Sequence, residues 1–200
     1  HVTDVQHTVI WDNPAEFQAI LITCAIPQNI SIVNRVSLID EDCNLPKNMM
    51  SVKSANFKNR STEKIGLCNK VMYSSPDAIR FVEWLELNLL FGIDKIYIYN
   101  TTIRGRSNDV IKLYSKHGTI DLRQHDYLDR LSRTITQSPF PSPDYNQNWQ
   151  LEVMSLTDCI YSSEEHYLLV IDLDEILYPV AGDFKSLLKQ NGFVTHNTSA

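Results

Sequence analysis

The sequence lacks the long apolar stretches of a membrane protein. It contains no run of about eighteen apolar residues and no basic start followed by a short apolar core, so neither a transmembrane helix nor a signal peptide is predicted within it. The chain also lacks a starting methionine, and we expect it to be a fragment of a longer protein. A membrane anchor would then lie outside this fragment.

Positive charge is also scarce. The chain has 18 Lys and Arg against 24 Asp and Glu, which gives a net charge of −6, and no basic stripe is visible. A nucleic-acid-binding surface is therefore not expected. Low-complexity tracts are absent, and 43% of the residues are hydrophobic, which is typical of a folded chain with one sizeable core.

The cysteines form no C-x-x-C pair, which argues against a zinc site or a redox dithiol. A secretory compartment would allow up to two disulfides. Three pairings are possible, and we favour one within the N-terminal part and one between a strand and a helix further on. These pairs are Cys24 with Cys43, and Cys68 with Cys159.

N-glycosylation sequons point to the same compartment. They begin at Asn29, Asn59, Asn100 and Asn197, although a chain of this composition contains roughly two by chance. We take Asn29, Asn59 and Asn197 as glycosylation candidates. Asn100 has a competing role that is described below.

The pattern of the chain changes near residue 61. Residues 1–60 contain two apolar, β-branched runs, 17–27 and 30–39, which predict two short strands, followed by a stretch without a clean period. We therefore expect a β-rich N-terminal segment. Residues 61–200 instead alternate between strand-like and helix-like patterns.

This alternation predicts an α/β fold with a parallel sheet and right-handed crossovers. Strands are expected at 65–73, 94–100, 119–124 and 166–175, and helices at 75–92, 107–118 and 145–163. Ser75 and Pro76 are typical of a helix start. The expected buried stripe of this first helix comprises Ala78, Val82, Leu85 and Leu89.

The stretch HYLLVIDLDEILYP (166–179) contains an apolar run that ends in Asp172, Asp174 and Glu175. Because the run is continuous, we expect a strand that is buried on both faces. Ligands of parallel sheets bind at the carboxyl ends of the strands, where strand order reverses. Two carboxylates at this edge suit a divalent cation that keeps open positions for phosphates. The alternative is that the acids are only solvated or cap the strand end.

Three stretches, in their order and spacing, resemble glycosyltransferase family 92. They are LCNKVMYSSPDAIRFVEWLELNLLFGIDKIYIYN (67–100), QLEVMSLTDC (150–159) and HYLLVIDLDEILYP (166–179). The resemblance covers roughly residues 65 to 180. It implies a GT-A fold with a Rossmann-like parallel-sheet core, in which residues 61–200 are the nucleotide-sugar-binding half, incomplete at the C-terminus.

The resemblance further implies a metal-dependent transfer of galactose from UDP-galactose to a glycan, with inversion at the anomeric carbon. The implied acceptor is an N-glycan carrying core fucose, and the implied location is the lumenal side of the Golgi membrane, behind a single anchor outside this fragment. The D-x-D motif falls on Asp172 and Asp174. Asp174 would bind Mn²⁺ or another divalent cation directly, with Asp172 near the metal or the ribose.

Other site residues follow from the same resemblance. In a sheet of strand order 3-2-1-4, the ends of the first two strands would face the uridine. A glycan on Asn100 would obstruct the nucleotide, so the two roles of this residue exclude each other. Gln150 matches a family glutamine only loosely, and no general base is identified. The expected nucleotide-sugar-binding residues are Tyr73, Ser74, Tyr99, Asn100 and Asp172.

Two other functions remain open from the sequence. In a haloacid-dehalogenase-type phosphatase, Asp172 would be the nucleophile and Asp174 the general acid. Ile176 stands where that family has Thr or Val, and the motif follows the fourth predicted strand instead of the first. The second alternative is a secreted, non-enzymatic binding module with a vestigial motif.

Overall fold

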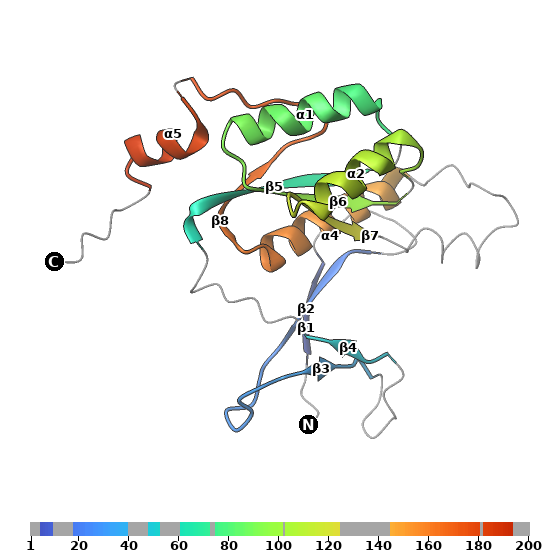
Figure 1. The fold of residues 1–200 in the computed structure, drawn as a ribbon. Coiled ribbons are helices and arrows are strands. Elements are labelled where there is room, and N and C mark those ends of the chain that lie inside the picture. The colour runs from blue at the N-terminus through green and yellow to red at the C-terminus, as the bar shows by residue number, and fades with distance from the viewer. Residues whose placement is uncertain are drawn as a thin grey trace, which may run out of the picture.

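The computed structural model describes residues 5–9, 18–39, 48–52, 61–72, 75–101, 103–124, 145–180 and 182–193. Within these ranges the main body is a parallel sheet with helices on both faces, and two small antiparallel strand pairs precede it (Figure 1). The predicted α/β fold class is confirmed.

The sheet consists of β5 (Ser61–Met72), β6 (Lys95–Asn100), β7 (Ile120–Gln124) and β8 (Glu165–Val170). These strands are parallel and lie in the order β7-β6-β5-β8, which is the order 3-2-1-4 named above. The strand order reverses between β5 and β8. The carboxyl ends of these two strands therefore form the edge at which such sheets bind ligands.

The prediction that the fourth strand is buried on both faces is wrong. Among the described strands, β8 pairs only with β5, and Val170 near its end is 43% exposed. The strand with the expected burial is β6, in which Ile96 to Asn100 are all buried. The difference arises because β6 has a neighbour on each side, whereas β8 lies at the edge of the described sheet.

The helices predicted in this region are present. They are α1 (Ala78–Leu90), α2 (Arg106–Lys116) and α4 (Tyr145–Ser162), and a short helix, α5 (Phe184–Gln190), follows. In Figure 1, α1 and α2 lie on one side of the sheet and α4 lies on the other. The sheet therefore has two separate packing faces.

The details of α1 differ from the prediction. Asp77, not Ser75, is the N-cap, and its carboxylate accepts hydrogen bonds from the backbone N–H groups of Ile79 (3.0 Å) and Arg80 (3.1 Å). Of the expected stripe only Leu85 is fully buried. The residues that α1 buries against the sheet are Phe81, Trp84, Leu85 and Asn88.

The strand β5 contains one extra residue near its carboxyl end. Cys68 pairs with Tyr97 and Val71 pairs with Tyr99, so three steps along β5 match two steps along β6. A β-bulge of this kind locally disrupts the ladder and redirects side chains.

The bulge also reverses which face of the sheet each side chain enters. Leu67 packs with the α1 and α2 core, and Cys68 packs with the α4 core. Regular alternation would place Val71 on the α1 side, yet Val71 lies in the α4 core and Met72 lies in the α1 core. The reversal occurs across residues 69–70.

The N-terminal region forms two antiparallel pairs, β1 (Val5–Val9) with β2 (Ile20–Cys24), and β3 (Arg35–Val36) with β4 (Met50–Ser51). The strand predicted in 17–27 is present as β2, whereas the run 30–39 contributes only two strand residues. The strand β1 was not predicted. The buried backbone N–H of Ala19 donates to Oε1 of Gln150 at 2.6 Å, which links this region to α4.

The structure joins Cys68 of β5 to Cys159 of α4 by a disulfide with a Cα–Cα distance of 6.1 Å, as predicted. Cys24 is an exposed free cysteine, which contradicts its predicted bridge, and Cys43 lies outside the described residues. None of the described helices is long and apolar enough to span a membrane.

Candidate functional site

A cleft of about 760 Å³ opens at the carboxyl ends of β5 and β8. Its walls come from the end of β5, the helix α1 with the residues that precede it, the helix α4 and the segment that follows β8. Only the two aspartates of its charged lining were predicted from the sequence. The charged residues that line it are Lys70, Asp77, Arg80, Glu83, Glu152, Asp172 and Asp174.

The turn after β8 presents both aspartates to this cleft. The Glu175 N–H donates to the carbonyl of Asp172, and the Glu175 carboxylate accepts the Asp172 N–H, each at 3.1 Å. Nε1 of Trp84 donates to the carbonyl of Glu175 at 2.9 Å, which anchors the turn to α1. Glu175 therefore braces the turn and does not line the cleft, whereas Asp172 and Asp174 do.

A buried amide fixes the position of this turn relative to β5. The side chain of Asn69, which is buried in the bulge, donates from Nδ2 to the carbonyl of Ile171 at 3.2 Å. Ile171 is the residue immediately before the motif. The bulge and the motif are thus held together by a direct side-chain contact.

The next residue of the bulge, Lys70, places a cation between two carboxylates. Its Nζ lies 3.1 Å from Oδ2 of Asp172 and 3.9 Å from Oε2 of Glu152. Burial acts to lower the pKa of Lys70, but its hydrogen bond and attraction to Asp172, with further attraction to Glu152, raise the pKa above its ordinary value. Lys70 is therefore charged at neutral pH.

Glu152 belongs to α4 and lines the cleft. Burial raises the pKa of Glu152 and the negative charge of Asp172 acts in the same direction, while the attraction of Lys70 acts against them. A carboxyl group in such surroundings is less costly to protonate than one in water.

The donor set suits a divalent cation that is bound jointly with a phosphate ligand. Within the described ranges, no group of three His, Cys, Asp or Glu residues is placed to hold a metal by itself. Small divalent cations such as Mg²⁺ often bind through one or two carboxylates, with waters and substrate phosphates as the other ligands. Asp172 and Asp174 fit this kind of shared site.

The structure describes only some of the residues predicted to face the uridine. Tyr73 and Ser74 lie outside the described residues. The Tyr99 side chain points to the α4 side of the sheet and is only 1% exposed, with its hydroxyl donating to Asp158 at 2.7 Å. Burial and this hydrogen bond engage the Tyr99 side chain on the α4 side of the sheet, and a contact of Tyr99 with the uridine stays a prediction.

Asn100 is also used locally. Its side chain is 5% exposed, and Oδ1 accepts a hydrogen bond from the backbone N–H of Ile103 at 2.7 Å. This contact shapes the loop after β6, and a role of Asn100 toward a nucleotide or a glycan stays a prediction. Of the glycosylation candidates, Asn29 lies exposed in a turn, and Asn59 and Asn197 lie outside the described residues.

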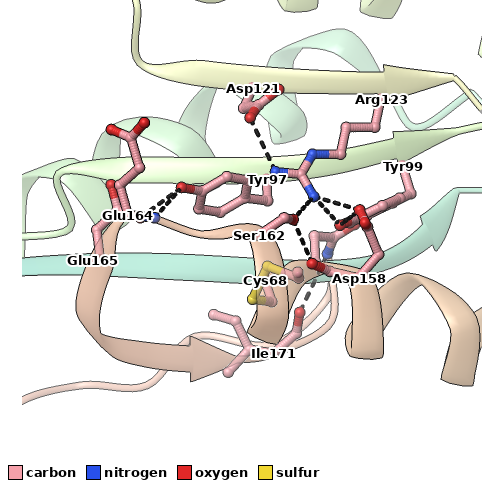
Figure 2. Close-up of a disulfide and its surroundings, with 12 residues drawn as sticks. Cys68, Tyr97, Tyr99, Asp121, Arg123, Asp158, Ser162, Glu164, Glu165 and Ile171 are labelled. Atoms are coloured by element: carbon pink, nitrogen blue, oxygen red, sulfur yellow. Dashed lines mark hydrogen bonds and ion pairs between the residues drawn. A yellow bond between two sulfur atoms is a disulfide. The ribbon is translucent and has the colours of Figure 1, made fainter. Parts of the chain in front are cut away.

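A second charged cluster, which we call the Arg123 network, comprises Tyr99, Asp121, Arg123, Asp158 and Ser162. Figure 2 shows it beside the disulfide of Cys68. The Arg123 guanidinium donates to Asp158 and Ser162, to Tyr99 at 2.8 Å and to Asp121 at 3.2 Å. The pKa of Tyr99 is raised by burial and by its bond to Asp158. Arg123 is mostly buried, whereas the side chains of Asp121 and Asp158 are 39% and 52% exposed, and the charges of these three residues offset one another.

Comparison with known proteins identifies a family for this chain. Residues 63–198 match the sequence model of Glycosyltransferase family 92. The Caenorhabditis elegans protein named "Glycosyltransferase family 92 protein ZK381.2" is 29% identical over 132 residues, which is 62% of this chain and 25% of that protein. The protein named "Beta-1,4-galactosyltransferase galt-1" from the same organism is 28% identical over 122 residues, 58% of this chain and 26% of that protein. The matched region thus spans about a quarter of the length of these relatives.

Proposed function

The chain belongs to glycosyltransferase family 92, and we propose that it forms the nucleotide-sugar-binding part of an inverting galactosyltransferase that uses UDP-galactose. The observation that carries this proposal is the cleft at the β5–β8 edge, which Asp172 and Asp174 both line and in which Asp172 lies beside Lys70. Family membership favours a transferase over the phosphatase and the binding module considered above.

The cleft residues have complementary roles in this proposal. Asp174, with Asp172 beside it, holds Mn²⁺ or another divalent cation, and the ion supplies positive charge that neutralises the diphosphate of the departing UDP. Lys70 and Arg80 add positive charge to the cleft lining. Asn69 and Glu175 contact the turn itself, so they keep the two aspartates in position.

The donor sugar and the acceptor rest on the relatives. One matched relative is named a beta-1,4-galactosyltransferase, which supports galactose as the transferred sugar. We propose a glycan acceptor, because the chain belongs to a glycosyltransferase family, with the core fucose of an N-glycan as the specific case that the sequence resemblance implies.

We further propose that the protein acts on the lumenal side of the Golgi membrane, held by an anchor outside this chain. The Cys68–Cys159 disulfide supports an oxidising compartment, because such bonds are rare in the cytosol. The exposed sequon at Asn29 is consistent with the same location. Treatment with an N-glycosidase is expected to lower the apparent mass of the protein. If the untreated wild type and the untreated Asn29→Gln variant have the same apparent mass, Asn29 is not glycosylated.

Ligand-induced stabilisation tests the proposed donor site. With the full-length protein, Mn²⁺ and UDP together are expected to raise the thermal midpoint more than either alone, because the ion links Asp174 to the diphosphate in the native state. This combined shift should disappear in Asp174→Ala and persist in Asp109→Ala, which removes an exposed acid from α2. An equal shift in Asp174→Ala would overturn the metal assignment, and beryllofluoride trapped on Asp172 would favour the phosphatase.

A further inference from the structure

Lys70 is the one basic residue within the bulge of β5, and the fold brings it directly to the metal motif. The bulge spans residues 69–70, where the alternation of β5 reverses. Bulges beside functional sites commonly redirect a side chain. Here the two bulge side chains contact neighbouring residues of one turn, since Asn69 binds the carbonyl of Ile171 and Lys70 binds the carboxylate of Asp172.

Hydrogen bonds hold the backbone near the Lys70–Asp172 contact, whereas the Lys70 ammonium is held by ion pairs at the tip of its side chain. The Asn69 amide ties the backbone at Ile171 to β5, and the Glu175 carboxylate holds the shape of the turn that follows. Lys70 itself is about one third exposed at its side chain, on a flexible four-carbon stem. Its ammonium can therefore move within the cleft without any change in the fold.

A divalent cation and the Lys70 ammonium both need the Asp172 carboxylate. Two positive groups held at one carboxylate repel each other at distances of a few ångströms. A diphosphate entering the same cleft offers the displaced ammonium a new anionic partner, and bonds between an ammonium and a phosphate oxygen are stronger than neutral ones. Glu152, with Oε2 3.9 Å from Nζ, is a second anion beside Lys70.

From this arrangement we propose that Lys70 is an exchangeable counter-ion of the D-x-D motif: it competes with the metal for Asp172, and it binds the diphosphate of the donor once the metal has taken that carboxylate. This inference rests on the proposed function, which supplies the metal and the nucleotide. On this proposal Lys70 weakens the binding of the metal alone and strengthens the binding of the nucleotide-sugar donor.

The opposite effects can be measured in the full-length protein by calorimetric titration. Lys70→Met is expected to bind Mn²⁺ alone about threefold to tenfold more tightly, because a competing surface ion pair is removed. The same variant is expected to bind UDP at saturating Mn²⁺ about tenfold or more weakly, because a charged hydrogen bond is lost. Lys70→Arg keeps the charge and should restore UDP binding to within about threefold of the wild type.

Two controls separate this role from a structural one. Lys112→Met removes an exposed lysine from α2 and should change neither affinity. Lys70→Gln is a second uncharged variant, which replaces Lys70→Met if that protein unfolds at a lower temperature than the wild type.

The outcomes distinguish the two proposals. The wild type is first expected to bind Mn²⁺ and UDP. If the uncharged variants then bind both ligands as the wild type does, or if both affinities change in the same direction, the role of Lys70 is overturned and the donor site stands. If the wild type binds neither ligand, the proposed function is overturned and the role of Lys70 falls with it.

Discussion

The Arg123 network and the cleft at the β5–β8 edge each contain a cation between carboxylates, but the two cations are held differently. Arg123 is 15% exposed at its side chain and donates to four different residues, while its guanidinium lies over the Tyr97 ring, 4.9 Å from its centroid. Lys70 is 33% exposed at its side chain and contacts two carboxylates, of which Glu152 is 3.9 Å away.

This difference indicates which cluster supports the fold and which one is available to a ligand. A planar guanidinium that is paired on every side has little to gain from a new partner, and its loss leaves several groups without their hydrogen bonds. An ammonium on a mobile stem, in an open cleft, exchanges partners at low cost. We therefore expect changes in the first cluster to affect stability and changes in the second to affect ligand binding and activity.

The largest expected effect concerns the disulfide beneath the Arg123 network. Cys159→Ser removes the link between β5 and α4, whose two cysteines are 91 residues apart in sequence. The free energy of unfolding is expected to fall by about 3 kcal/mol, because the unfolded chain is no longer constrained. Urea denaturation measures this change. The matched control is Cys24→Ser at an exposed free cysteine, and equal losses in both variants would contradict the structural role of the bridge.

The next effect lies in the cleft and should appear in activity, not in stability. Asp174→Asn keeps the size of the side chain but removes the charge that binds the metal, so turnover is expected to fall at least about a hundredfold, or about 2.7 kcal/mol. UDP release with and without a fucosylated N-glycan acceptor, at fixed Mn²⁺, measures this loss.

Glu175→Gln is the matched neighbour of Asp174→Asn. Since Glu175 braces the turn and does not line the cleft, its effect on turnover should be smaller. An active Asp174→Asn protein together with an inactive Glu175→Gln protein would show that the opposite face of the turn binds the metal.

A smaller effect is expected for Arg123→Met. The change leaves the hydroxyl of Tyr99 and the carboxylate of Asp158 without their cationic donor, and we expect about 2 kcal/mol of destabilisation in urea denaturation. UDP affinity at saturating Mn²⁺ should stay within about twofold of the wild type. Arg106→Met at the exposed start of α2 is the control. A loss of UDP affinity without loss of stability would remove the distinction between the two clusters.

The smallest effect is a change of pH dependence at Glu152. Burial raises the pKa of this carboxyl in the folded protein. The contribution of Glu152 to stability is therefore largest below its unfolded pKa and falls as the pH rises through its folded pKa. Glu152→Gln should raise the thermal midpoint by no more than about 2 °C at pH 7 and give no gain at pH 4.

The pKa of Asp183 is shifted in the opposite direction to that of Glu152. Its hydrogen bonds with Ser186 lower the pKa of Asp183, so its contribution is present above its unfolded pKa and is lost as the pH falls through its folded pKa. Asp183→Asn should therefore lower the thermal midpoint at pH 7 and have less effect in acid. If Glu152→Gln and Asp183→Asn both raise or both lower the thermal midpoint at pH 7, the assigned pKa shifts are contradicted.

Much of the fold could be predicted because it depends on local pattern. The alternation of apolar runs with helix-like segments predicts the four parallel strands and the helices between them, and DLD after the last strand predicts an acidic edge. Helix limits were less accurate, because Ser75 and Asp77 both have side chains that can cap a helix. Only the hydrogen bonds of Asp77 show which residue does so.

By itself, then, the sequence determined the α/β class, the position of the two aspartates at a strand end, and the pairing of Cys68 with Cys159 as the favoured one. The tertiary structure alone decided that β8 lies at the edge of the described sheet, that Tyr99 faces α4, and that Lys70 contacts Asp172. These features depend on strand order and on a one-residue bulge that reverses the facing of side chains. Neither leaves a periodic signal in the sequence, because both result from pairing between residues that are distant along the chain.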